Sequence, residues 1–223
     1  MKILAIADIH NDLENLMGYL DKVSEMDFDV IVCPGDFTDV EPKGFTSEEI
    51  GRIVLEELKS LGKPIVAVPG NWDRDIINIL EEEGVSVHGK GKIIDNVGFY
   101  GFGGAKTPFN TKYEPSEEEI EAGLRKAFEE IKDATFKVQV THAPPFETRL
   151  DMAFSGAHVG SKVVRALIEE FKPAVAICAH IHEGRGTDRI RDTLVVNPGR
   201  FPEGYCALVE VGKRVNAELV NLT

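Results

Sequence analysis

The sequence has few of the residues and segments that mark several common classes of protein. Only three of its 223 residues are cysteine, and they lack CxxC spacing, so we interpret them as buried free thiols in a reducing compartment. The apolar runs have the length of strands and are too short to span a bilayer. There is no internal repeat and no low-complexity tract. The sequence therefore predicts a globular protein, not a membrane-spanning, fibrous or disulfide-rich one.

Positive charge is also scarce. The chain has 25 Lys and Arg against 38 Asp and Glu, and its formal net charge is −13. A protein that binds nucleic acid polymers without regard to sequence needs a basic surface, so a polymeric nucleic acid partner is not expected. A small phosphate-ester substrate is compatible with this charge, because bound metal ions can reverse the local field.

No targeting segment is apparent. The apolar N-terminus is interrupted by Asp8, His10 and Asp12, and no small-residue cleavage site follows. The composition is 43% hydrophobic and 28% charged, and 223 residues are enough for one substantial core. We therefore expect a single cytoplasmic α/β domain over residues 1–223, without a membrane partner. The sequence leaves open whether the chain forms a homo-oligomer.

Short β-branched runs alternate with amphipathic segments in the first part of the chain, and strand follows strand at its end. The predicted strands are residues 2–7, 30–33, 65–68, 85–88, 92–94, 98–101, 137–141, 174–178, 193–196, 205–211 and 215–219. The predicted helices are residues 12–26, 47–61, 73–83, 116–131 and 161–171. The alternation predicts parallel strands, and the tail predicts an antiparallel or mixed portion. Two sheets packed face to face, with helices outside, accommodate both the parallel strands and the antiparallel or mixed tail.

Five of the predicted strands end in Asp, Asn or His. Taken singly, each of these short motifs could be a helix cap or an ordinary turn. In open α/β sheets, however, the carboxyl ends of the strands are where ligands bind. A mixed set of nitrogen and oxygen donors from five segments suits two divalent ions such as Mn, Fe, Zn, Co or Ni better than a structural role. The candidate metal ligands are Asp8, His10, Asp36, Asn71, His142, His180 and His182.

In their order along the chain these motifs are DxH, GDxxD, GNxD, a lone His after a strand, and HxH. This ordered set resembles the calcineurin-like metallophosphoesterase superfamily, from Asp8 to His182. The resemblance implies a four-layer αββα sandwich of two mixed sheets, and hydrolysis of phosphate esters by direct attack of a metal-bridging hydroxide. It also implies the ligands of two metal ions. One ion is held by Asp8, His10, Asp36 and His182, and the other by Asp36, Asn71, His142 and His180.

The only tryptophan of the chain lies inside the third motif. Most of the superfamily has a histidine there, and the resemblance implies that this histidine acts as general acid, paired with the aspartate at the position of Asp39. An indole can donate a hydrogen bond but cannot deliver a proton. General acid catalysis contributes about 10²–10⁴-fold, so we expect esters with good leaving groups, and phosphodiesters above all. Trp72 is then expected to form a stacking wall beside the metal ions; the alternative is that it anchors the following helix.

Residues 141–161 form a long connection between a strand and a helix, and connections of that length are usually functional or disordered. The segment resembles the insert of small prokaryotic members of the superfamily, which share HAPP, a following HxGS and a late NPG. Arg149 is predicted to contact phosphate, and His158 to replace the missing acid; alternatively, His158 only precedes a helix that Ser161 caps. Asn197, in the NPG turn, is predicted to orient a ligand of the HxH motif.

These predictions define a candidate active site. The catalytic candidates are Asp36, Asn71 and His158, and the substrate-binding candidates are Asn71, Trp72, Arg149 and His158. The predicted function is a dinuclear metal-dependent phosphodiesterase. The alternatives are a phosphomonoesterase or nucleotide phosphatase, and a metal-binding scaffold without catalysis. A scaffold would be expected to have lost ligands, and all seven are present.

Overall fold

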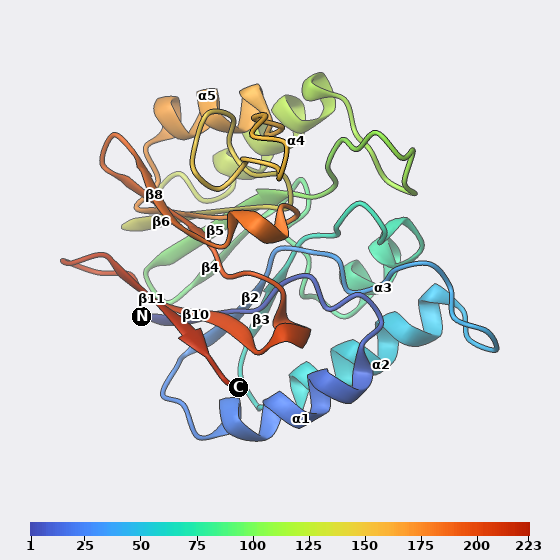
Figure 1. Ribbon diagram of the computed structural model, residues 1–223. Coiled ribbons are helices and arrows are strands. Elements are labelled where there is room, and N and C mark those ends of the chain that lie inside the picture. Colours follow the sequence, from blue (N-terminus) through green and yellow to red (C-terminus); the bar gives the residue numbers. More distant parts are fainter.

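The computed structural model describes residues 1–223 as two mixed β-sheets packed face to face, with helices on both outer faces (Figure 1). The first sheet has the order β11 (Asn216–Asn221), β10 (Tyr205–Glu210), β1 (Lys2–Ala5), β2 (Val30–Cys33) and β3 (Ile65–Ala67). The second has the order β4 (Gly91–Ile94), β5 (Val97–Phe102), β6 (Phe136–Thr141), β7 (Val175–Ile177), β9 (Thr193–Asn197) and β8 (Gly186–Ile190). This arrangement confirms the predicted αββα sandwich.

The helices cover the outer faces of the two sheets. The first sheet is covered by α1 (Leu13–Ser24), α2 (Ser47–Lys59) and α3 (Ile77–Glu82), and the second by α4 (Glu117–Glu129) and α5 (Lys162–Phe171). None of these helices is both long enough and apolar enough to cross a membrane. Three short 3₁₀ turns complete the regular structure, at Arg74–Ile76, His182–Gly184 and Phe201–Glu203.

Each gap between layers contains its own apolar cluster, because successive side chains of a strand point to opposite faces. In β1, Ile3 and Ala5 pack between the two sheets, whereas Leu4 faces α1 and α2. The strands read as continuous apolar runs because they are buried on both faces. This burial is the reason that strand positions were readable from the sequence.

The strands that carry the candidate ligands are parallel neighbours. In the first sheet β1 pairs with β2 and β2 with β3, all parallel. In the second sheet β5, β6, β7 and β9 run parallel in that order. The antiparallel strands β4, β8, β10 and β11 lie toward the edges, as the strand-rich tail indicated. The carboxyl ends of the parallel strands therefore open on one edge of the sandwich.

Two predicted elements differ from the structure, and one strand was not predicted. Residues 85–88 form only isolated bridges, in which Ser86 pairs with β3 and His88 with β5, so the segment crosses from one sheet to the other. Residues 73–83 are a 3₁₀ turn followed by the short helix α3. Strand β8 was not predicted, because an edge strand paired only with β9 lacks a continuous apolar pattern.

Candidate metal centre

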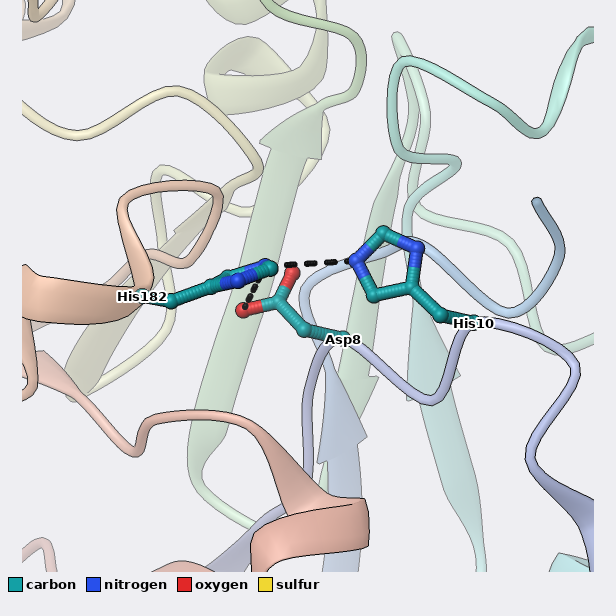
Figure 2. Close-up of side chains that lie close together, drawn as sticks. All are labelled: Asp8, His10 and His182. Atoms are coloured by element: carbon teal, nitrogen blue, oxygen red, sulfur yellow. Dashed lines mark hydrogen bonds and ion pairs between the residues drawn. The ribbon is translucent and has the colours of Figure 1, made fainter.

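The seven predicted ligands converge from five loops at this edge. Asp8 and His10 follow β1, Asp36 follows β2 and Asn71 follows β3. From the second sheet, His142 directly follows β6, and His180 and His182 follow β7. The Asp and His residues form two groups, within each of which the ligand atoms lie no more than 4.8 Å apart: Asp8, His10 and His182, and Asp36, His142 and His180. Figure 2 shows the first group, with the three side chains pointing toward one another from the two halves of the sandwich.

The distances place Asp36 between the two groups. Its Oδ2 lies 3.5 Å from His10 Nε2 and 3.3 Å from His142 Nε2. In the first group, His10 Nε2 and His182 Nε2 are 3.2 Å apart. In the second, Asn71 Oδ1 lies 2.9 Å from His142 Nε2, so its amide oxygen joins this group. A carboxylate in this position can serve both groups at once.

The loops that carry the ligands have an unusual backbone. Asp8, His10, Asp36 and His180 all have positive φ, between 52° and 73°. Non-glycine residues adopt this region rarely, and strained backbone concentrates at functional sites. Backbone hydrogen bonds hold it in place, including Asp8 N–H to the Gly35 carbonyl at 3.1 Å. The strain indicates that the loops are shaped to position ligands.

Two of the candidate ligand histidines have a contact on the other ring nitrogen. His142 Nδ1 lies 2.8 Å from the Pro34 carbonyl oxygen. His10 Nδ1 lies 3.3 Å from Asp39 Oδ2, so Asp39 contacts a ligand histidine instead of the missing histidine at position 72. Such carbonyl and carboxylate contacts orient metal-binding imidazoles in proteins.

Two further polar residues position the ligand loops. The buried carboxylate of Asp73 accepts hydrogen bonds from the backbone N–H groups of Phe37, Thr38 and Gly70, which ties the loop after β2 to the loop after β3. Asn197 donates through Nδ2 to the carbonyl of Ile181, between the two histidines of HxH. This hydrogen bond is consistent with the predicted orienting role of Asn197. Asp73 is the last residue of the GNxD motif, but the sequence analysis did not identify its role in joining the two loops.

The protonation of the ligands follows from their burial. Burial lowers the pKa of His180 to about 3, with a further contribution from His142, so its imidazole is neutral at pH 7. Burial alone would raise the pKa of Asp36, but the adjacent imidazoles, His142 first, hold it below its ordinary value. Against the effect of burial, Asp36 raises the pKa of His142 to about 9. Metal binding at this histidine would therefore displace a proton.

The residues present fit divalent metal ions. Asp8 is fully buried, and its Oδ2 has no hydrogen-bond partner. A buried carboxylate oxygen without a partner is costly, and a cation beside it would supply the missing interaction. Imidazole nitrogens together with carboxylate and amide oxygens are the donors that Mn, Fe, Co, Ni and Zn accept. We conclude that this edge is built to hold cations.

A cavity of about 580 Å³ opens beside the two groups. His10, Asp36, Asn71, His180 and His182 line its metal side. The half-buried indole of Trp72 lines it too, while the backbone N–H of Trp72 donates to Asp36 Oδ1 at 3.1 Å. The remaining wall comes mainly from two loops. The loop after β5 contributes Lys106, Thr107, Pro108, Phe109 and Thr111, the loop after β6 contributes Ala153, Phe154, Ser155 and Val159, and Ile181 and Glu183 complete the wall. Sequence analysis missed the first of these loops, since no motif marks it.

The structure does not place the other two substrate-binding candidates in this cavity. Arg149 Nη2 donates to the Thr187 carbonyl, and its Nε lies 3.9 Å from Asp188 Oδ2. His158 Nδ1 lies 2.7 Å from the buried carboxylate of Asp151. Neither side chain lines the cavity. Lys106 does line the cavity. The two glycines shortly before it, Gly103 and Gly104, pack closely against Pro69 and Pro115.

Comparison with known proteins agrees with this geometry. The family model for calcineurin-like phosphoesterases matches residues 1–184, and the chain belongs to this family. An uncharacterized protein of Methanocaldococcus jannaschii is 37% identical over 213 residues, which cover 92% of this chain and 90% of the relative. Among solved structures, a protein of Thermus thermophilus matches with a TM-score of 0.76 at 22% identity, covering 100% of this chain and 99% of the other.

A second solved structure is described as a novel archaeal phosphodiesterase. It matches with a TM-score of 0.55 at 18% identity, covering 99% of this chain and 100% of the other. At these identities the two structural matches establish the fold alone. The predicted superfamily and fold are confirmed, and the protein is a phosphoesterase by family.

Proposed function

We propose that this protein is a dinuclear metal-dependent phosphodiesterase acting on small phosphate esters. The observation that carries the proposal is the position of Asp36 between two groups of metal-binding side chains. A shared carboxylate suits two ions held roughly 3.5–4 Å apart, the arrangement used for in-line displacement at phosphorus. When bound, two such ions stabilise charge on the phosphoryl oxygens and lower the pKa of a water nucleophile.

The side chains of the protein have distinct roles in this proposal. Asp8, His10, Asp36 and His182 hold one ion, and Asp36, Asn71, His142 and His180 hold the other. Asp39 and Asp73 are positioning residues, since they contact a ligand histidine and a ligand loop. Asn71 lines the cavity, so its amide is also placed to contact a phosphoryl oxygen.

Trp72 is the main support for a diester substrate. It lies in the cavity wall, where the resemblance implies a proton-donating histidine, and it cannot donate a proton. The alternative substrate, a phosphomonoester, is favoured by one observation: Lys106 lines the cavity, where its positive charge would meet the second negative charge of a monoester.

A paired substrate screen tests the proposal. Metal-free protein is loaded in turn with Mn²⁺, Ni²⁺, Co²⁺, Zn²⁺ or Mg²⁺, and assayed against bis(p-nitrophenyl) phosphate and p-nitrophenyl phosphate. We expect metal-dependent hydrolysis, with the higher kcat/KM for the diester. A preference for the monoester would select the alternative. Two bound ions without turnover of either substrate would identify a metal-binding scaffold.

The leaving group should also control the rate. Because Trp72 supplies no proton, kcat for a series of aryl phosphodiesters is expected to fall steeply as the pKa of the leaving phenol rises. Trp72→His should make this dependence shallower and speed the poorest leaving groups by up to about 10²-fold. Trp72→Phe, which keeps an apolar wall without an acid, is the matched control and should retain the steep dependence.

A shallow dependence in the unmodified protein, with chemistry rate-limiting, would contradict this account. Another group would then supply the proton. Lys106, which lines the cavity, and His158, the candidate from the sequence, would be tested by Lys106→Ala and His158→Ala.

A further inference from the structure

Two phenylalanines at the cavity are almost fully exposed. The exposed fraction is 80% for Phe109 and 94% for Phe154, and both line the same cavity as the metal-binding side chains. We call these two residues the aromatic rim. Exposed large apolar side chains gathered at one place mark binding surfaces more often than chance, whereas single ones are common. The exposure of the aromatic rim therefore indicates a ligand-binding surface.

The loop that carries Phe109 is held by hydrogen bonds. The Glu114 carboxylate accepts from Thr107 Oγ1 at 2.6 Å, from Thr111 N–H at 2.6 Å and from Thr111 Oγ1 at 2.8 Å. Phe109 N–H in turn donates to Thr107 Oγ1. These contacts close the loop on both sides of Phe109, so the exposure of its ring follows from an ordered backbone.

The loop that carries Phe154 is held in a similar way. Met152 and His158 form an antiparallel bridge, and Ala153 N–H donates to the carbonyl of Ala157, which makes a small hairpin with Phe154 at its tip. Phe154 N–H donates to Glu183 Oε1 at 2.8 Å. Because Glu183 directly follows the metal-ligand candidate His182, the position of Phe154 is tied to the metal centre.

The chemistry of the cavity defines what the rim binds. The cations that the candidate ligands would hold attract a phosphoryl group to one side of the cavity, and the aromatic side chains of Trp72 and the rim line the same cavity. Aromatic side chains stack on flat rings whatever substituents the rings carry. An aromatic wall therefore favours a ligand with a flat ring over one with an aliphatic chain. We propose that the rim binds a flat aromatic ring carried by the phosphate ester, such as a nucleobase. This inference rests on the proposed function for the placement of the phosphoryl group.

Direct binding tests the inference without turnover. Phenylphosphonate and methylphosphonate differ by the ring and are not hydrolysed as esters. Adenosine 5′-monophosphate and ribose 5-phosphate, in short titrations at low temperature, differ by the base. Because Trp72 is the only tryptophan and lies in the cavity wall, its fluorescence reports binding to the metal-loaded protein. We expect the ring-bearing member of at least one pair to bind about tenfold more tightly or better.

Substitutions then locate the effect. Phe109→Ala and Phe154→Ala should lower the affinity for the ring-bearing probe about tenfold. Methylphosphonate binding, metal content and thermal stability should stay unchanged. Phe45→Ala is the matched control, since Phe45 is 52% exposed and lies outside the cavity. It should change none of these quantities.

The outcomes separate this inference from the proposed function. Preference for both ring-bearing probes would define an aryl site, and preference for the adenosine probe alone a nucleobase site; each supports the rim. Equal affinity within both pairs, or variants that bind the ring-bearing probe like the unmodified protein, would overturn it. Failure of the hydrolysis screen would contradict the phosphodiesterase proposal but would leave a measured ring preference intact.

Discussion

Asp36→Asn is expected to lower kcat/KM by at least about 10³-fold and to weaken the binding of both metal ions. The reason is the place of Asp36 Oδ2, within 3.5 Å of a histidine of each group. An asparagine removes one negative charge and turns part of the ligand into an N–H donor, which repels cations. Loss of an ion removes several kcal/mol of transition-state stabilisation, and 10³-fold corresponds to about 4 kcal/mol. Elemental analysis after desalting, together with kinetics, measures both effects.

Asp95→Asn is the matched control. Asp95 lies in the turn between β4 and β5 and has φ of 53°, close to the 55° of Asp36, and asparagine tolerates this backbone region. The control should retain close to two ions per chain and full activity. The dinuclear account would be wrong if the unmodified protein bound one ion at saturating metal, or if Asp36→Asn retained both ions at full occupancy.

Gly70→Ala is expected to remove most activity and to destabilise the fold. A Cβ at position 70 would lie 2.0 Å from Asp36 Oδ1 and 2.2 Å from Asp36 N, so the loop after β2 would have to move. Overpacking of this kind costs about 1–3 kcal/mol, or roughly 2–12 °C in the melting temperature of a chain of this size. Thermal melts of the metal-free protein measure this directly, separately from lost metal binding.

The control is Gly18→Ala, in the interior of α1. Nothing lies within 4 Å of a Cβ built there, and alanine has the higher helix propensity. This variant should be more stable by about 0.5–1 kcal/mol and equally active. If Gly70→Ala melted like the unmodified protein and kept its activity, the close approach of the two ligand loops would not be needed for function.

The comparison of sequence and structure shows which features were readable in advance. The seven candidate metal ligands lie together, because each is in a loop that follows a buried strand, and parallel strands end at the same edge. Arg149 and His158 were chosen for their chemistry and for the place of their loop directly after His142. The directions of such side chains depend on loop contacts, here Asp188 and Asp151, which no local pattern reveals.

The sequence by itself determined the layered fold, the candidate metal ligands and the absence of a proton donor at Trp72. These features depend on local patterns: continuous apolar runs of strand length, polar residues at strand ends, and the chemistry of one side chain. Only the tertiary structure decided that Asp39 contacts His10, that Asp73 ties two ligand loops together, and that Phe109 and Phe154 border the metal cavity. These contacts join residues far apart in the chain, and they form only once two sheets and their loops have packed.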